Sequence, residues 1–360
     1  MAGILMVAGE ASADRHAAGI IHSLKTCFPG MEIFGMGGPL MQDAGMDCVY
    51  SMADLSVMGF TDVVYRLLGI LKIYSGIRRL ISERKPDIFV PVDLPDFNMR
   101  LAAYAKKNRV KVLYYIAPQA WAWRVYRARV ISRITDGLAV IFPFEEAFFR
   151  ARGVNARYVG HPLLEQRLEP FRVSWPPERI ALLPGSRVHE VRKILPTMIQ
   201  AKRKLARDHP GISWYLYASR GLEDSEFSEY IDGDVEICRC LPEVDAAMVK
   251  SGTGAFEIAM HGVPEVICYK TSLINYILAK VFVKTSAIGM PNIMAGYKVV
   301  PELIQSDFTA ERLYDTLGRY IDNEDLYRDT RSKLIELRSK MGDKNASEEV
   351  ARWIIDVLSA

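Results

Sequence analysis

Several loops of this sequence combine small, acidic and hydroxyl-bearing residues directly after a run of apolar residues. The first spans residues 9–18, GEASADRHAA, and precedes a stretch with helical periodicity. Ser12 and Asp14 are of the types that cap helix N-termini, so we expect them to cap that helix. Free amide groups at such a terminus suit an anionic or hydroxyl-rich ligand, and Glu10 can accept hydrogen bonds from a sugar. The loop predicts a sugar-binding site, with a purely capping role for Ser12 and Asp14 as the alternative.

The second loop lies in residues 182–196, LLPGSRVHEVRKILP, and again joins an apolar run to a helical pattern. Gly185 permits a tight turn. Arg187 follows Ser186, and its planar guanidinium matches phosphate oxygens in pairs. We predict a phosphate contact here; a structural turn with a surface arginine is the alternative.

The third loop lies in residues 250–270 and contains Ser251, Gly252 and Thr253 just before a helical pattern. Small residues let backbone amides approach a diphosphate, and the helix dipole adds a modest attraction. Glu257 lies one turn into the helix, where its carboxylate is placed to bridge the ribose hydroxyls of a nucleotide. The alternative is an acidic first-turn residue that only interacts with the dipole.

The fourth loop spans residues 291–305 and offers two neutral amides, Asn292 and Gln305. Such groups suit sugar hydroxyls and phosphate oxygens. No Asp-x-Asp metal motif accompanies the four loops, so we expect no metal or other cofactor. Arg187 and helix-terminal amides would then neutralise a leaving diphosphate.

Asp93 is the predicted general base. It directly follows the apolar run of residues 88–92, and its apolar neighbours favour a raised pKa, which makes a carboxylate a better base. Asp96 follows a proline and is expected only to cap the next helix. His16 and His161 are rival bases because histidine titrates near neutrality, and a loop-capping role for Asp93 is the other alternative.

The bulk composition excludes several classes of protein. The formal charge is +3 with a pI near 8.5, which is too mild to predict nucleic-acid binding. The five cysteines form neither a CxxC motif nor a zinc-binding pattern, so free thiols in a reducing compartment are expected. No apolar run reaches the ~18 residues of a membrane span, and the first residues lack a signal-peptide pattern. We expect a cytoplasmic protein that is soluble or peripheral.

Apolar runs alternate with helical patterns in two series, which predicts two α/β domains with parallel sheets. A charged, proline-rich stretch at residues 165–178 separates the series. We predict a first domain over residues 1–168 and a second over 169–344, facing each other across a cleft where ligands bind. The predicted strands are 4–7, 33–34, 88–92, 110–115, 138–142, 180–183, 213–217, 235–238, 246–249 and 265–269.

Residues 62–85 form a helical pattern whose apolar positions cover well over half of the circumference, more than a core stripe needs. Leu67, Leu68 and Leu71 belong to the apolar surface, and Arg78 and Arg79 to its basic rim. This combination is typical of contact with an anionic membrane or a lipid. Contact with another subunit or with the core is the alternative.

Taken together, these stretches resemble the lipid-A-disaccharide synthase family. The order and spacing of the motifs carry the resemblance, and the double-tryptophan motif is the most specific of them. It extends strongly over residues 1–305. The motifs are GEASADRHAA, VMGFTDVV, PVDLPDF, APQAWAW, VGHPL, LLPGSR-x-x-E, SGTGAFE and PNIMAG.

The resemblance implies a GT-B-type fold of two Rossmann-like domains and an inverting hexosyl transfer. The donor would be UDP-2,3-diacylglucosamine and the acceptor 2,3-diacylglucosamine 1-phosphate (lipid X), joined through a β-1,6 linkage with release of UDP. Asp93 matches the family's candidate base, and Arg187 and Asn292 match donor or phosphate contacts. Family members are peripheral at the inner leaflet, several form homodimers, and their C-terminal helix, here residues 345–360, often packs on the first domain.

Two departures and three alternatives accompany this resemblance. Ala13 and Ala17 stand where the family usually has glycine, which bears on the geometry of the acceptor loop. A UDP-N-acetylglucosamine 2-epimerase or a peptidoglycan-lipid glycosyltransferase would use the same fold and a UDP-sugar, but an epimerase has no use for the basic apolar stretch 62–85. A membrane-docked UDP-sugar sensor would not need Asp93.

Overall fold

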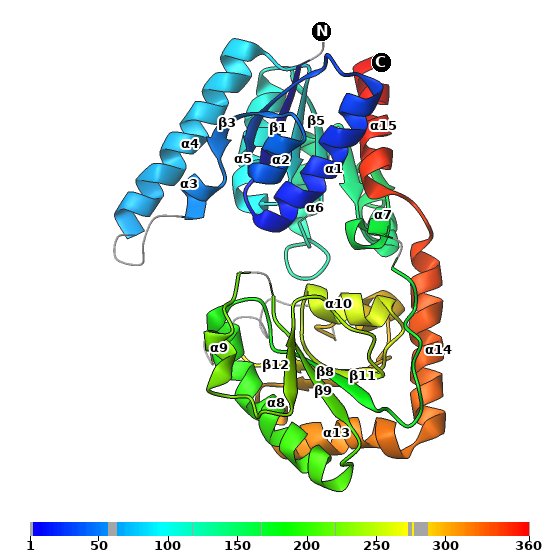
Figure 1. Cartoon of the computed structure of the whole chain (residues 1–360). Coiled ribbons are helices and arrows are strands. Elements are labelled where there is room, and N and C mark those ends of the chain that lie inside the picture. The colour runs from blue at the N-terminus through cyan, green and yellow to red at the C-terminus, as the bar shows by residue number, and fades with distance from the viewer. Residues whose placement is uncertain are drawn as a thin grey trace. The chain divides into compact units, whose positions relative to one another are not determined.

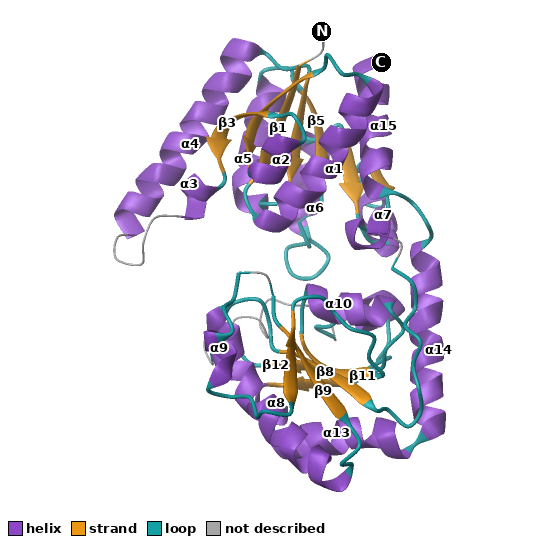
Figure 2. Cartoon of the chain, in the orientation of Figure 1, coloured by secondary structure: helices purple, strands orange, loops and turns teal. Residues whose placement is uncertain are grey.

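The computed structural model describes residues 3–56, 63–116, 118–166, 168–219, 221–272, 276 and 287–359, with the side chains of 55, 56, 63–67 and 166 excepted. The chain divides into two compact units (Figures 1 and 2). Unit 1 contains Met1–Gln166 and Asp343–Ala360, and unit 2 contains Arg167–Gly342. The domain boundaries expected from the sequence differ from these by two residues at each junction.

The described part of unit 1 contains a seven-stranded parallel sheet in the order β3-β2-β1-β4-β5-β6-β7. Its strands are β1 (Gly3–Ala8), β2 (Glu32–Gly37), β3 (Asp47–Ser51), β4 (Ile88–Val92), β5 (Lys111–Tyr115), β6 (Gly137–Val140) and β7 (Ala156–Tyr158). Its helices are α1 (Ala11–Cys27), α2 (Pro39–Asp43), α3 (Ala53–Ser56), α4 (Val63–Arg84), α5 (Pro95–Lys107), α6 (Tyr126–Ile134), α7 (Pro143–Arg150), the 3₁₀ helix η1 (Pro162–Gln166) and α15 (Ala346–Ser359).

Alternate residues of β1 enter two separate cores, as the two-residue period of a strand requires. Ile4 and Met6 pack with α1 and with Trp353 of α15 on one face of the sheet. Leu5 and Val7 pack with α4 and α5 on the other face. The C-terminal helix α15 therefore returns to unit 1 and lies against α1 (Figure 1).

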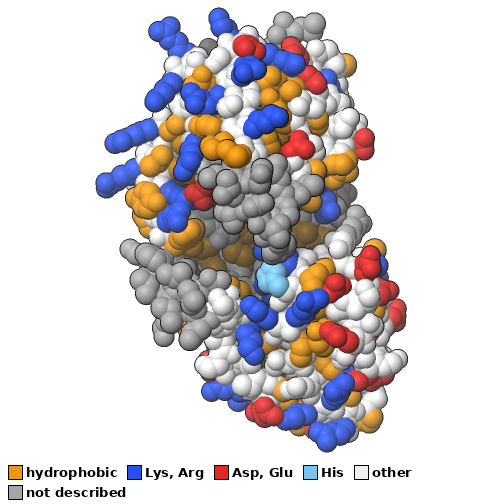
Figure 3. Space-filling model, turned by 90° about the vertical axis from the view of Figure 1, so that its left-hand side faces the viewer, with side chains coloured by type: hydrophobic (Ala, Val, Ile, Leu, Met, Phe, Trp, Pro, Cys, Tyr) orange, Lys and Arg blue, Asp and Glu red, His pale blue; other side chains and the backbone are white. Residues whose placement is uncertain are grey.

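Helix α4 is buried along one stripe and exposed along another. Ile73 and Ile77 are buried in the core, whereas Leu68 is 56% exposed and Leu71 is 50% exposed. Leu67 lies in the part of α4 whose side chains are not described. Figure 3 looks onto the side where α4 lies and shows lysine and arginine side chains standing out from unit 1 beside apolar ones.

The described part of unit 2 contains a six-stranded parallel sheet in the order β10-β9-β8-β11-β12-β13. Its strands are β8 (Arg179–Leu183), β9 (Ser213–Tyr217), β10 (Val235–Cys238), β11 (Ala246–Lys250), β12 (Glu265–Tyr269) and β13 (Glu302–Ile304). Its helices are α8 (Val188–Asp208), α9 (Ser225–Ser228), α10 (Thr253–Met260), α12 (Met290–Ala295), the 3₁₀ helix η2 (Gln305–Asp307), α13 (Ala310–Asp322) and α14 (Glu324–Met341).

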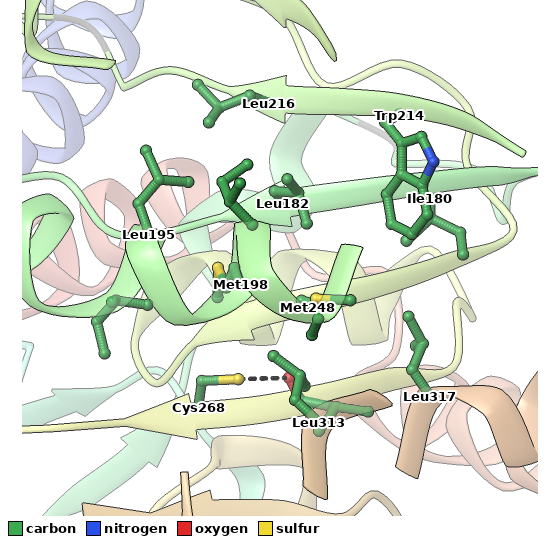
Figure 4. Packing of buried hydrophobic residues seen from close by; sticks show 14 of the residues in the cluster. Ile180, Leu182, Leu195, Met198, Trp214, Leu216, Met248, Cys268, Leu313 and Leu317 are labelled. Carbon is green, nitrogen blue, oxygen red and sulfur yellow. Dashed lines mark hydrogen bonds between the residues drawn. The ribbon is translucent and has the colours of Figure 1, made fainter. Parts of the chain in front are cut away.

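A hydrophobic core of unit 2 packs this sheet against helices that include α8 and α13 (Figure 4). Leu195 and Met198 of α8 meet Leu182 and Leu216 of the central strands, and Leu313 of α13 approaches the same core from the side of β12. The predicted pair of parallel α/β sheets is confirmed. Three short strands, β3, β7 and β13, were not predicted because they are brief and half-exposed rather than continuous apolar runs.

The strand order places the candidate loops together within each unit. All paired strands are parallel, so their carboxyl ends lie at one edge of the sheet. The order reverses direction between β1 and β4 in unit 1 and between β8 and β11 in unit 2. Open α/β sheets bind ligands outside the carboxyl ends of the strands at such a reversal. The loops with Glu10 and Asp93 follow β1 and β4, and those with Arg187 and Ser251 follow β8 and β11.

Candidate functional site

Asp93 lies at the carboxyl end of β4 in an unusual backbone conformation. Its φ is +51°, and that of Leu94 is +50°. Non-glycine residues rarely adopt positive φ, and the surrounding structure must hold them there. The Asp93 amide donates to the Tyr115 carbonyl of β5 at 3.0 Å, which ties the turn to the neighbouring strand.

Two buried side chains, one from α5 and one from β5, hold the Asp93 carbonyl. Tyr114 donates its hydroxyl to this oxygen at 2.7 Å, and Asn98 donates Nδ2 to it at 2.8 Å. Asn98 is fully buried on α5, and its Nδ2 also lies 3.3 Å from the Val7 and Val92 carbonyls. Neither residue was predicted from the sequence. The signal available in the sequence was an asparagine, Asn98, at a helical spacing that it shares with the apolar residues Leu101, Ala102 and Ala105.

The Asp93 carboxyl lies in an environment that disfavours its charged form. Burial raises its pKa above the ordinary value, and the negative charge of Glu10 raises it further. Glu10 is close because β1 and β4 are neighbours and Ala8 pairs with Val92. A carboxylate with a raised pKa is suited to accept a proton from a hydroxyl near neutral pH.

The predicted capping roles of Ser12 and Asp14 are wrong. Helix α1 begins at Ala11, so Glu10 occupies the N-cap position and makes no side-chain capping bond. Ser12 is exposed in the first turn. The buried Asp14 carboxylate instead accepts hydrogen bonds from the amides at the start of α2, at 2.8 Å from Gly38, 3.1 Å from Leu40 and 3.1 Å from Met41. Asp14 therefore joins α1 to α2.

The rival histidines are poor bases in this structure. Burial lowers the pKa of His16 to about 4, with a contribution from Arg15. Burial also lowers the pKa of His161 to about 3, and His161 Nδ1 accepts from the Leu163 amide at 3.1 Å. A lowered pKa makes each of these imidazoles a weaker base than an ordinary histidine.

Two further acidic residues make contacts around the loop between β5 and α6, which contains Trp121 and Trp123. Trp121 donates Nε1 to the buried Glu145 at 2.9 Å, and burial raises the pKa of Glu145 to about 7. Asp96 lies in the first turn of α5 and pairs with Arg127 of α6, so it ties the loop after β4 to the helix after β5 rather than capping α5. These contacts were not predicted from the sequence.

Unit 2 contains a cavity of about 250 Å³ at the carboxyl ends of β8, β9 and β11. It brings together four of the predicted donor-site residues, Ser186, Gly252, Thr253 and Glu257. The cavity wall also includes Leu183, Gly185, Glu190, Tyr217, Ser219, Val249, Lys250 and Gly254. Backbone amides at the start of α10 and a carboxylate one turn later thus share one cavity.

Arg187 and Ser251 stand beside this cavity rather than in its wall. Arg187 is the N-cap residue of α8, and its side chain is largely exposed with the guanidinium 4.0 Å from the Glu190 carboxylate. Ser251 donates its hydroxyl to the Ile288 carbonyl at 3.1 Å and its amide to the Cys268 carbonyl at 2.9 Å. Ser251 therefore shapes the turn, and Gly252, with φ +152°, leads into α10.

Asn292 and Gln305 have their amide groups engaged within unit 2. Asn292 is buried. Its Nδ2 donates to the Val300 carbonyl at 2.9 Å and to the Glu302 carboxylate at 2.8 Å. Its Oδ1 accepts from the amides of Val299 at 2.7 Å and Val300 at 3.0 Å. Gln305 pairs both of its amide atoms with the Thr271 backbone. The structure thus shows a framework role for both residues, and their predicted donor contact stays a prediction.

Within the described residues, no group of three or more His, Cys, Asp or Glu side chains is arranged to hold a metal ion. A search of the same residues for a helix long and apolar enough to cross a membrane also finds none.

Comparison with known proteins finds a matching family model, a similar relative and two solved structures of similar fold. The family model described as lipid-A-disaccharide synthetase matches residues 4–354. The lipid-A-disaccharide synthase of Geobacter metallireducens is 37% identical over 372 residues, which cover 99% of this chain and 97% of that protein.

Two solved structures are similar in fold. One is the UDP-GlcNAc 2-epimerase from Neisseria meningitidis bound to UDP-GlcNAc, with a TM-score of 0.65 and 10% identity, covering 98% of this chain and 100% of that one. The other is the calicheamicin glycosyltransferase CalG4, with a TM-score of 0.65 and 15% identity, covering 100% of this chain and 98% of that one. At these identities the two structures show the fold alone.

The substitution Asp14→Ala is expected to destabilise unit 1. Three amides of the α2 turn would lose their acceptor, which typically costs about 1–3 kcal/mol for a buried group. Urea denaturation followed by circular dichroism measures the loss, and Asp43→Ala, an exposed carboxylate at the end of α2, should change stability by less than about 0.5 kcal/mol. Equal stability of the two variants would show that the hydrogen bonds from the α2 turn to Asp14 do not stabilise unit 1.

Proposed function

This chain belongs to the lipid-A-disaccharide synthetase family, and we propose that it joins two acylated glucosamines at a membrane surface. It is a glycosyltransferase with the parallel α/β sheets of the GT-B fold. In our proposal the donor is UDP-2,3-diacylglucosamine and the acceptor is 2,3-diacylglucosamine 1-phosphate. The products are the β-1,6-linked disaccharide 1-phosphate and UDP.

The proposed transfer is a single displacement with Asp93 as the base. The acceptor 6-hydroxyl oxygen forms a bond to C1 of the donor sugar while the bond from C1 to the phosphate oxygen breaks. The electron pair of that bond leaves with UDP, and the hydroxyl proton passes to the Asp93 carboxylate. The observation that carries this role is the half-buried Asp93 at the β1/β4 reversal, with its raised pKa and with its backbone carbonyl held by Tyr114 and Asn98.

The proposed donor site is the cavity at the β8/β11 reversal. Amides at the start of α10, around Gly252 and Thr253, suit the diphosphate. Glu257 lies one turn further in the same wall, at a place suited to the ribose hydroxyls. Arg187 and Ser186 are proposed to meet the phosphates from the side of α8, and we propose that the transfer proceeds without a metal ion.

The exposed surface of α4 is the proposed contact with the inner membrane. Leu68 and Leu71 are half-exposed leucines on this helix. The Arg79 side chain is largely exposed. The Arg78 guanidinium carbon instead lies 4.1 Å from the centre of the Tyr104 ring, in a cation–π contact. An apolar surface with a basic rim is attracted to anionic lipid headgroups. Both substrates in the proposal carry acyl chains, which makes access from a membrane necessary.

The substitution Asp93→Asn is expected to leave UDP binding unchanged and to reduce turnover by at least ~10²-fold, because the amide cannot accept the acceptor's proton. Disaccharide formation and UDP release from the two acylated substrates give the rate, and calorimetry gives UDP affinity. A parallel assay without acceptor should leave the UDP-sugar unchanged.

Near-normal turnover of Asp93→Asn would move the base to another residue. Interconversion of the UDP-sugar without acceptor would instead assign the protein to the epimerases that share its fold. Asp87→Asn, at the residue that precedes β4, serves as the control for a carboxylate changed near the opposite end of the strand.

The substitution Glu10→Gln is expected to move the acid limb of the pH dependence of kcat/KM to lower pH. A base acts only when unprotonated, so activity falls as the pH drops through the pKa of Asp93. That pKa is raised by burial and by the Glu10 charge, and removal of the charge lowers it. Glu83→Gln, on the exposed surface of α4, should keep the wild-type profile. A shift to higher pH, or none, contradicts the electrostatic coupling.

The double substitution of Leu68 and Leu71 by serine is expected to weaken binding to vesicles that contain anionic phospholipid, because it removes exposed apolar area from α4. Vesicle co-sedimentation measures the effect, and UDP affinity should stay the same. Leu326→Ser, an exposed leucine on α14 of unit 2, is the matched control. Unchanged co-sedimentation of the α4 variant would favour a subunit contact over a membrane contact.

A further inference from the structure

Lys250 and Glu190 form an ion pair in the wall of the unit 2 cavity. Lys250 is the last residue of β11, and Glu190 lies in the first turn of α8. Their Nζ and Oε1 atoms are 2.9 Å apart, and the side chains are only 21% and 12% exposed. This pair is therefore more protected from solvent than an ordinary surface ion pair, and it lines the same cavity as Thr253 and Glu257.

Glu190 is held from several sides by the turn before α8. Its Oε2 accepts from the Ser186 amide at 3.1 Å, and its Oε1 lies 4.0 Å from the Arg187 guanidinium. A Cβ atom at position 185 would come within 2.5 Å of Oε2, so only glycine leaves room for the carboxylate there. Burial acts to raise the pKa of Glu190, but the hydrogen bond and charge of Lys250 hold it below the ordinary value.

The ammonium of Lys250 lies next to the start of α10. Its Nζ is 3.7 Å from the position that a Cβ on Gly252 would occupy, and Gly252 is the N-cap residue of that helix. A cation at a helix N-terminus is on the unfavourable side of the dipole. Several positive groups thus converge here: Lys250, Arg187 and the first amides of α10. Glu190 is the anionic partner of Lys250 and Arg187.

We propose that Lys250 is the cation that binds the diphosphate of the donor and stabilises the charge on the leaving UDP, with Glu190 as the residue that positions it. This inference rests on the proposed function of the cavity. An ammonium group has three donor hydrogens, so Lys250 can keep its bond to Glu190 while it donates to phosphate oxygens. As the bond from C1 to oxygen breaks, negative charge grows on the β-phosphate, next to a cation that is already in place.

The test compares UDP and uridine as ligands of the full-length protein by calorimetry, with EDTA present throughout. Lys250→Met should weaken UDP binding by about tenfold to hundredfold, the range for a hydrogen bond to a charged group. It should leave uridine binding unchanged, because uridine has no phosphate. Lys250→Arg should restore most of the UDP affinity. Lys204→Met, which breaks the Lys204–Glu311 ion pair on the surface of unit 2, should bind both ligands like the wild type.

The positioning role of Glu190 has a separate readout. Glu190→Gln should reduce the preference for UDP over uridine, since the ammonium is then less well held. A merely structural defect would weaken both ligands equally and leave that preference unchanged. Thermal unfolding of each variant checks that the fold is retained.

Wild-type UDP affinity in Lys250→Met, or an equal loss of UDP and uridine binding, overturns the inference. If the wild-type protein forms disaccharide while Lys250→Met binds UDP normally, the proposed function stands and the assignment of Lys250 is wrong. If the wild type forms no disaccharide but Lys250→Met selectively loses UDP affinity, the proposed transfer is wrong and Lys250 is still the diphosphate cation.

Discussion

The proposed chemistry depends on the backbone conformation of Asp93 and Leu94. Two consecutive non-glycine residues with positive φ are unfavourable by about 1–3 kcal/mol each. Buried hydrogen bonds from Tyr114 and Asn98 to the Asp93 carbonyl offset this cost. They also fix where the Asp93 carboxylate points as the chain leaves β4. The Glu10 charge then adds to the effect of burial in raising the pKa of this half-buried carboxyl group.

The sequence was sufficient to predict the sheets because most strands are buried on both faces. Such strands appear as continuous apolar runs, and the runs at β4 and β12 match the observed strands residue for residue. Once the sheets are parallel, a loop that follows a strand must lie at the carboxyl edge. The positions of Asp93 and of the loop before α10 were therefore predictable from their order in the chain.

Residue type alone did not predict the hydrogen-bond partners of the polar side chains. Asp14, Asn292 and Gln305 were expected to meet a ligand, but each binds backbone groups that come from distant or irregular parts of the chain. Lys250 was not predicted as a site residue, because its partner Glu190 is 60 residues away in the sequence. Hydrogen bonds between loops depend on the packing of the whole sheet, and no local pattern encodes them.

The distance between the Asp93 carboxylate and the acceptor hydroxyl tests the central claim most directly. It can be measured in a crystal structure of the protein with UDP and 2,3-diacylglucosamine 1-phosphate bound together. We predict that a carboxylate oxygen of Asp93 lies about 2.6–3.2 Å from the acceptor 6-hydroxyl, or one water molecule away, with the positive φ of Asp93 and Leu94 retained. An acceptor hydroxyl that is remote from Asp93 and within reach of another base would contradict the account.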